Sequence, residues 1–313
     1  MHSVQPKWTG WKWENAVAGG VAGLAPVVAL YPFDIVRTRF QVHDGRHSGV
    51  PSYRNTLHAL YTIRRVEGLR GLYAGLLPAL LGSSLSWSLY FFLYGSIKER
   101  NQRLFERDEL GPLLHLLSGA EAGSTATVIT NPVWVVKTRL QLQAPGHGAR
   151  KPYASFSDAF RSILREEGLR GLYKGLGPGL ILVSHGALQF MAYEEGRKFL
   201  ISHRSKRAPG QPFEISTKEQ LVTSRDFAIL GGSSKLFAVM ATYPIQVVRS
   251  RLQQRPSKDG VSRYVNTWYT FKTTMRYEGF RGLYKGIVPH LLRVVPSSSL
   301  QFLVYESILK FLN

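Results

Sequence analysis

A block of nine residues recurs three times along this chain. It reads PFDIVRTRF at 32–40, PVWVVKTRL at 132–140 and PIQVVRSRL at 244–252. About 35 residues after each copy comes a second block, and its copies EGLRGLYAG, EGLRGLYKG and EGFRGLYKG begin at Glu67, Glu167 and Glu278. A period of about 100 residues is too long for one unit of a solenoid. The pattern therefore predicts three copies of one module.

Uncharged stretches predict that each module crosses a membrane twice. Six stretches of at least 19 residues carry no Lys, Arg, Asp or Glu, or only one: 15–33, 71–97, 110–136, 175–193, 227–248 and 286–305. The single charged residues are Glu121, Lys235 and Arg293. A helix needs about 20 mainly apolar residues to cross the hydrocarbon layer. Six spans are expected, and a soluble protein with six buried core helices is the alternative.

The positive charge lies in the connections between paired spans. Of the net charge of +20, +17 falls in 37–70, 137–174 and 249–285. Such a distribution indicates one membrane face and an anionic surface partner. No zinc-finger spacing or stacking-aromatic RNA motif is present, so nucleic acid is not an expected partner. The chain has no cysteine, and neither a metal site nor a bound cofactor is expected.

The expected repeats are 10–104, 110–202 and 225–313, with a polar linker at 203–224. The first spans, 14–42, 112–143 and 225–254, each carry a proline that predicts a kink: Pro32, Pro132 and Pro244. The connections keep apolar residues at helical spacing, which predicts short helices in the membrane surface. Pairs of glycines four apart, Gly19 with Gly23 and Gly119 with Gly123, predict close helix approach. The N-terminus has no apolar signal core, so any targeting signal is expected within the mature chain.

The two blocks, Pro-x-Asp-x-x-Arg-x-Arg with its variants and then Glu-Gly and Gly-Leu-Tyr-x-Gly, resemble those of the mitochondrial carrier family over the whole chain. The segments NPVWVVKTRLQLQ (131–143), SWSLYFFLYG (86–95) and SHGALQFMAYE (184–194) resemble the branch that carries folate and FAD, with plant-type folate carriers the nearest. NAD and pyrimidine-nucleotide carriers are neighbouring branches. The resemblance implies an all-α membrane protein: six transmembrane helices in three pseudosymmetric repeats form a barrel, with short surface helices and one central site.

The resemblance also implies a gate on the matrix side, a ring in which the acid of one repeat faces the base of the next. The bases are Arg37, Lys137 and Arg249; the acidic positions are Asp34, Trp134 and Gln246; the brace positions beneath are Gln41, Gln141 and Gln253. Only Asp34 and Lys137 can form a full ion pair. Trp134 could stack on a cation such as Arg249, worth about 0.5–2 kcal/mol, or serve as an interfacial anchor, while Gln246 can only hydrogen-bond.

A second gate is implied at the far ends of the even spans, where the family reads Tyr-Glu-x-x-Arg. Repeat two has Glu194 and Arg197, whereas repeat one keeps only Lys98 and repeat three only Glu306. One or two ion pairs remain, depending on which neighbour each residue faces.

The implied substrate positions lie near midplane, seven residues beyond the recurring Gly75, Gly175 and Gly286. They are Gly82, Leu182 and Arg293, with Ser83 and Val183 beside them; Lys235 and Trp134 are further candidates. A charge in hydrocarbon costs about 2.5–3.5 kcal/mol or more, so Arg293 should face a polar cavity, where it could bind a carboxylate or phosphate in bidentate fashion. Lys235 and Glu121 are open between solute contact and internal pairing, and His185 between core residue and ligand.

The function expected is transport of folate, or a related large anionic cofactor, by alternating access. FAD or NAD and nucleotides of the same family are the alternatives, and a non-transporting structural membrane protein is a third reading. Trp134, Trp87 and Tyr90 offer flat faces for a fused heterocycle. An enzyme is not expected, because the chain has no nucleophile elbow, HExxH or GxxxxGK[ST]. The expected chain is a monomer in a lipid bilayer, cardiolipin included, in the mitochondrial inner membrane or alternatively the plastid envelope.

Overall fold

The structure is a computed structural model that describes residues 13–45, 51–106, 110–144, 152–207, 223–256 and 263–312. Every regular element in these ranges is a helix. Repeat one holds α1 (Trp13–Ala29), α2 (Tyr31–Val42), α3 (Thr56–Leu72) and α4 (Leu76–Leu104). Repeat two holds α5 (Pro112–Gln141), α6 (Phe156–Leu172), α7 (Leu176–Ile181) and α8 (Ser184–Arg207). Repeat three holds α10 (Ser224–Leu252), α11 (Thr267–Gly282) and α12 (Ile287–Leu312). If α1 with α2 and α7 with α8 are each taken as one broken helix, the order of long, short and long helix recurs three times.

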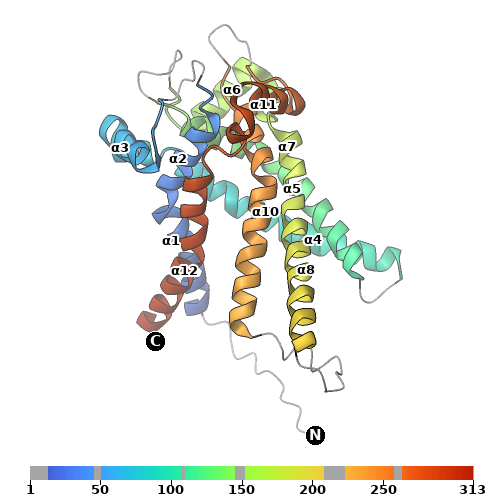
Figure 1. Ribbon diagram of the computed structural model, residues 1–313. Helices are drawn as coiled ribbons and strands as arrows, with labels where there is room; N and C mark the ends of the chain where they lie inside the picture. Colours follow the sequence, from blue (N-terminus) through green and yellow to red (C-terminus); the bar gives the residue numbers. More distant parts are fainter. Residues whose placement is uncertain are drawn as a thin grey trace.

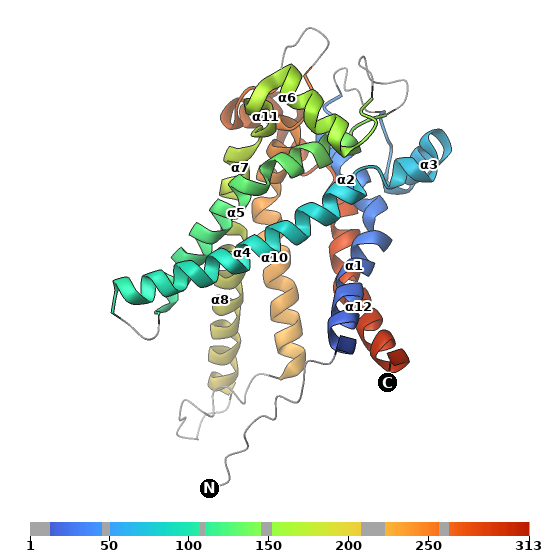
Figure 2. The same ribbon diagram turned by 180° about the vertical axis from the view of Figure 1, so that it is seen from behind.

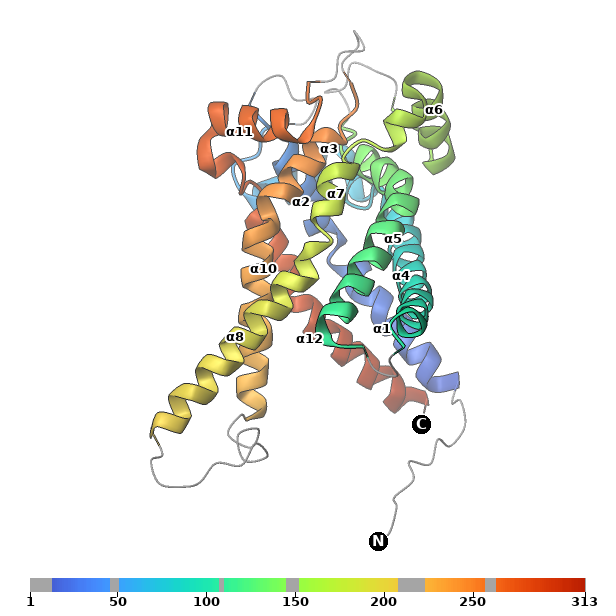
Figure 3. The same ribbon diagram turned by 90° about the vertical axis from the view of Figure 1, so that its right-hand side faces the viewer.

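The long helices pack in three pairs, and each pair joins the last helix of one repeat to the first helix of another. The pairs are α4 with α5, α8 with α10, and α12 with α1, the last of which closes the ring. The pairs diverge toward the end where the C-terminus lies (Figure 1, Figure 3). Figure 2 shows α4 and α5 running obliquely away from the other pairs. At the opposite end α2 packs against both α5 and α10, so the barrel is closed there and open at the far end.

The short helices α3, α6 and α11 gather at the closed end (Figure 1). Each begins at a side-chain cap: Asn55, Ser155 and Asn266 accept a hydrogen bond from the N–H three residues further on. Beneath them lies the buried apolar core, where Val36 packs near Ile63 and Val136 near Ile163. The three basic connections therefore lie at one end of the molecule, as their charge predicts.

The second long helix of each repeat, which begins with α4, α7 or α12, follows a glycine that no other residue could replace without strain. Gly75, Gly175 and Gly286 all have a φ between 76° and 82°. A Cβ atom on them would lie 3.1, 3.3 and 2.8 Å from the carbonyl oxygens of Lys137, Arg249 and Arg37, in that order. A left-handed conformation and this close approach both favour glycine. The glycines let α4, α7 and α12 begin directly against the backbone of Lys137, Arg249 and Arg37, each of which belongs to another repeat.

The long helices are apolar on their outside. Large side chains such as Leu77, Leu81 and Phe92 of α4 are more than half exposed, as on a surface that faces lipid rather than water. Two described helices, Leu76–Leu104 and Ile287–Ile308, combine spanning length with a mean hydropathy of 1.5 and 1.2. The bent pair Val21–Ala29 and Tyr31–Val42 would make a third. On length and hydropathy alone, the described residues thus supply fewer spans than the six predicted.

The backbone at the recurring proline differs among the three copies of the first block. In repeat one the helix breaks before Pro32, and α1 and α2 meet at a bend of 50°. Pro132 and Pro244 instead lie inside α5 and α10, which run on through them. The break gives Asp34 a place in the first turn of a new helix, where the helix dipole favours a negative charge.

Candidate substrate cavity and gates

Asp34 is the centre of the closed end. Its carboxylate is buried, and Lys137 Nζ lies 2.5 Å from Oδ2. Arg37 and Arg293 each place Nη1 near Oδ1, at 3.7 and 3.6 Å. Gln141 Nε2 donates a further hydrogen bond of 3.0 Å to Oδ2. One carboxylate therefore holds cations from α2, α5 and α12, and thus from all three repeats.

The other two positions of the ring differ from the expectation in one respect. Arg37 donates to Gln246 Oε1, so this neutral pair forms. The indole of Trp134, however, contacts Lys137, whose Nζ lies 5.6 Å from the ring centroid, and the expected stacking on Arg249 is not formed. Arg249 has no ion-pair or hydrogen-bond partner within the described ranges, and its guanidinium lies near Gly179.

Contacts with α4 explain where the indole of Trp134 lies. A Cβ atom on Gly82 would lie 3.1 Å from Val133 Cγ1 and 3.6 Å from Trp134 Cε2, so α4 packs closely on α5 at the indole. Trp134 Nε1 also donates to Ser86 Oγ at 3.3 Å, one turn further along α4. The ring is therefore drawn onto the neighbouring helix and away from Arg249. Ser86 thus positions Trp134, which the sequence pattern did not indicate.

The brace glutamines form a cyclic set between repeats. Thr38 donates to Gln141 Oε1 at 2.8 Å, Thr138 to Gln253 Oε1 at 2.8 Å, and Ser250 to Gln41 Oε1 at 2.7 Å. The amide nitrogens differ, however. Gln141 Nε2 binds Asp34, whereas Nε2 of Gln41 and of Gln253 is buried with no partner among the described residues. The ring positions that these two glutamines brace hold Gln246 and Trp134 instead of a carboxylate, which explains the loss.

A second threefold set escaped the sequence reasoning. Arg39, Arg139 and Arg251 are almost fully buried, and their Nε atoms donate to the backbone carbonyls of Gln141, Gln253 and Gln41 at 3.0–3.1 Å. Their guanidinium groups bind the glutamates that open the second block: Glu67, Glu167 and Glu278. Each arginine thus joins its own surface helix to another repeat. The signal was available, because this arginine and this glutamate recur in all three copies.

Two of these glutamates, Glu167 and Glu278, stay charged because of these contacts. Burial alone would raise the pKa of Glu167, but hydrogen bonds from Arg139 and Lys174 hold that pKa below its ordinary value. The pKa of Glu278 is lowered in the same way, against burial, by Arg251 and Lys285. The closed end is therefore fastened by charge-assisted hydrogen bonds outside the gate ring as well as within it.

The remaining substrate positions lie on helices around the open end of the gate. Leu182 and Val183 occupy the break between α7 and α8, and Ser83 follows Gly82 on α4. A Cβ atom on Gly123 would lie 2.9 Å from Val183 Cγ1, so the second glycine pair does permit close approach. Gly23 of the first pair has nothing within 4 Å of such an atom. Arg293 comes from α12, and its contact with Asp34 ties a predicted substrate residue directly to the gate.

The three polar residues of open role are now placed. Glu121 pairs with Arg100 at 2.6 Å on the exposed side of α4 and α5, which favours internal pairing over solute contact. Lys235 forms no ion pair with any residue that the structure describes, and it lies on α10 near His185. His185 itself lies 3.0 Å from Thr242 Oγ1 through Nδ1. Trp87 stacks on the exposed Phe91, while Tyr90 packs against α5 at Gly119.

The second predicted gate is not assembled in this state. Within the described part of the chain, Lys98, Glu194 and Glu306 make no ion pair with one another or with other side chains, and Arg197 follows Glu194 by one turn of α8. The helix pairs that carry these residues are the ones that diverge (Figure 3). The molecule is therefore closed at the end of Asp34 and open at the end of Glu194.

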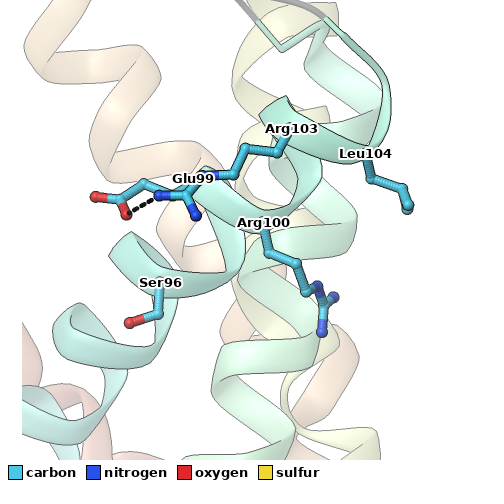
Figure 4. A pocket seen from close by; sticks show the side chains of 5 residues that line it. All are labelled: Ser96, Glu99, Arg100, Arg103 and Leu104. Atoms are coloured by element: carbon cyan, nitrogen blue, oxygen red, sulfur yellow. Dashed lines mark ion pairs between the residues drawn. The ribbon is translucent and has the colours of Figure 1, made fainter.

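A surface pocket lies elsewhere, at the C-terminal end of α4. Figure 4 shows its lining side chains, among which Glu99 and Arg103 form an exposed pair at 3.9 Å: Ser96, Glu99, Arg100, Arg103 and Leu104. None of the expected substrate positions lines it. We therefore place the candidate site between the gate and the open end, not in this pocket.

Comparison with known proteins agrees with this arrangement. The family model of the mitochondrial carrier protein matches three stretches of the chain, residues 10–104, 108–204 and 223–313. The chain belongs to the mitochondrial carrier family. It therefore has the three-repeat, all-helical carrier fold that the sequence predicts.

Several relatives align with this carrier over most of their length. It is 55% identical to the chloroplastic folate transporter 1 of Arabidopsis thaliana over 303 residues, which cover 97% of this chain and 96% of the relative. It is 36% identical to the chloroplastic nicotinamide adenine dinucleotide transporter 1 of the same plant, covering 95% and 91%. It is 34% identical to a mitochondrial pyrimidine nucleotide transporter of Saccharomyces cerevisiae, covering 96% and 86%. All three relatives are named as transporters.

Proposed function

We propose that this carrier transports folate across an organellar membrane by alternating access. The single observation that carries the proposal is Arg293, a predicted substrate residue that reaches the gate carboxylate Asp34 while the opposite end of the barrel is open. The name of the 55% identical relative supports folate as the solute. The site thus offers an anion-binding group next to the gate that the anion must open.

Charge and shape favour a large anion. Three cations, Lys137, Arg37 and Arg293, surround the carboxylate Asp34. Arg249 and Lys235 have no acidic partner among the described residues, so added negative charge would stabilise the site. The positions Gly82 and Leu182 carry no charge and leave space on the other sides. Trp134 offers a flat face, and stacking of an aromatic base on such a side chain is worth about 1–3 kcal/mol. Folate has both parts, a fused heterocycle and carboxylates.

Binding would weaken the gate through Arg293. When the Arg293 guanidinium forms a bidentate pair with a substrate carboxylate, it can no longer form its ion pair with Asp34. Asp34 would then keep Lys137 and the more distant Arg37 but lose its contact to α12. The closed end would lose part of the attraction between repeats only when an anion is present. This links occupancy to opening, as alternating access requires.

The relatives at 34% and 36% identity are named as pyrimidine nucleotide and nicotinamide adenine dinucleotide transporters, which favours a dinucleotide or FAD as the second candidate. These solutes also combine a heterocycle with anionic groups. For the compartment, the mitochondrial inner membrane is the family's usual place, and the chloroplastic relatives support the plastid envelope as the alternative. We propose that the carrier acts as a monomer in a bilayer that contains anionic lipid such as cardiolipin. Transport itself would involve no covalent reaction.

Counterflow tests transport itself. The purified chain is reconstituted into liposomes loaded with unlabelled folate, and labelled folate is added outside. The proposal predicts transient accumulation of label above its equilibrium level, with Asp34→Asn and Arg293→Ala as impaired variants. Uptake no faster than in empty liposomes for folate, FAD and NAD alike would favour the non-transporting structural protein and would overturn the proposal.

A further inference from the structure

His185 lies beside the substrate positions of repeat two, at the start of α8 and two residues beyond Val183. Its Nδ1 is 3.0 Å from Oγ1 of Thr242 on α10. The ring is partly exposed, and Nε2 has no hydrogen-bond partner and is not among the buried polar atoms of the described residues. One nitrogen is therefore fixed by the protein, and the other remains available.

The hydrogen bonds of Thr242 decide which nitrogen carries the proton. A hydroxyl has one hydrogen to donate and two lone pairs that accept. Thr242 donates its hydrogen to the backbone of its own helix, 2.8 Å from Ala238 O. Gln246 Nε2 donates to Oγ1 at 3.3 Å, and the remaining lone pair faces His185. This pattern of contacts assigns the donor role to His185 Nδ1, and in a neutral imidazole Nε2 is then an acceptor.

The surroundings of His185 fit this assignment. The backbone of Ala238 and the side chain of Lys235, both on α10, lie near the ring, and no carboxylate among the described residues pairs with it. The same Thr242 oxygen also holds Gln246, which accepts from Arg37 of the gate. The acceptor on α8 is thus held in place by a chain of contacts that reaches the closed end. The cations near Asp34 supply donors, so His185 offers the complementary property.

We propose that His185 Nε2 accepts a hydrogen bond from an N–H group on the heterocycle of the substrate, while the anionic end of the substrate lies toward Arg293. For folate this is the donor edge of the pterin ring, formed by its amino group and the adjacent ring N–H. The inference rests on the proposed function, because it names the part of the solute that this residue reads. His185 is a specificity residue, whereas Thr242 positions it.

Analogues that block the donor edge test the contact. One analogue replaces the amino group of the pterin with methyl, and a second carries a methyl on the adjacent ring nitrogen. Inhibition of labelled folate uptake is measured for folate and both analogues. A hydrogen bond of ordinary net strength corresponds to a preference for folate of about fivefold to tenfold over at least one analogue in the wild-type carrier. His185→Ala is expected to reduce this preference to less than about twofold.

Two isosteric variants separate the nitrogens. His185→Gln places an amide near the Nε2 position and is expected to keep most of the preference. His185→Asn reaches only the Nδ1 position and is expected to lose it, although it can still bond Thr242. His115→Ala is the matched control, since His115 is bonded to Tyr94 on another helix pair and should leave the preference intact. Binding of folate and analogues in detergent, read as a thermal shift, provides the same comparison for variants that insert but do not transport.

Three results would overturn the inference. The first is a wild-type carrier that does not distinguish folate from either analogue. The second is an equal preference in the wild-type carrier and His185→Ala, which refutes the contact while folate transport stands. The third is the absence of folate binding by the wild-type protein, which refutes the proposed substrate together with this contact.

Discussion

Removing the charge of Asp34 should unlock the closed end. In this structure its carboxylate is bonded by Lys137 and Gln141 and lies within 4 Å of Arg37 and Arg293. Asp34→Asn keeps the shape and one oxygen but leaves three cations without a counter-charge. Removing one partner of a buried ion pair costs about 3–5 kcal/mol. Since 1.4 kcal/mol is a factor of ten, the closed end should open at least about 100-fold more often.

Because the chain has no cysteine, opening of the closed end can be measured by labelling one introduced thiol. A single Ser83→Cys change gives the chain its only thiol, at a position shielded by the gate from the side of α3, α6 and α11. An impermeant maleimide is added from that side to vesicles of known orientation, and the labelling rate is followed. Asp34→Asn in this background should label at least about 100-fold faster if opening limits the rate. Gln246→Ala is the control, since it removes one neutral partner of Arg37 and should give a smaller increase.

Equal labelling rates for Asp34→Asn and the parent would refute the reasoning, as would a larger effect of Gln246→Ala. The double change Asp34→Lys with Lys137→Asp provides a further check. It restores the pair in isolation, but the new lysine would lie close to Arg37 and Arg293. Only a small recovery of gate closure is therefore expected.

Three further predictions follow from the same contacts. Arg293→Ala should abolish uptake of an anionic solute while the protein still inserts, and Arg293→Lys should restore little because it lacks bidentate geometry; near-normal uptake by Arg293→Ala in liposomes would remove it from the site. Thiols placed by Arg65→Cys, Arg165→Cys and Arg276→Cys should all be labelled from one face of sealed vesicles, and labelling of any one from the other face would contradict the topology. Glu167→Gln should lower stability by about 3 kcal/mol at pH 7. Because the folded-state pKa of Glu167 is lowered, this contribution is present above its ordinary 4.5 and is lost as pH falls through the folded value. Thermal unfolding in detergent should therefore show the difference at pH 7 and not at strongly acid pH, and a difference that persists there would contradict the ion pair.

The repeat architecture could be predicted because the period of the motifs and the local composition both indicate it. The recurring prolines, the uncharged stretches and the basic connections each fix one local property, and they recur in register. At the prolines of the first spans, the helix breaks only in repeat one, beside Pro32, whereas α5 and α10 continue through Pro132 and Pro244. The break at Leu182 between α7 and α8 carries no such signal.

The contacts between repeats were harder, because they depend on which helix faces which. Sequence spacing identified Gln41, Gln141 and Gln253 but could not show that Arg39 bonds the carbonyl of Gln141 in the next repeat. Likewise, the place of Trp134 depends on its hydrogen bond to Ser86, which belongs to another helix. The approach of Arg293 to Asp34 joins residues 259 positions apart in sequence, and only the closed ring brings them together.

The most direct test of the account is a competition panel on the reconstituted wild-type carrier. Uptake of labelled folate is measured against equal concentrations of unlabelled folate, FAD, NAD, malate, phosphate and ADP. The account predicts that folate inhibits best, with FAD and NAD next, because the site pairs the cation Arg293 with uncharged space and an aromatic face. Stronger inhibition by malate, phosphate or ADP than by folate would contradict it.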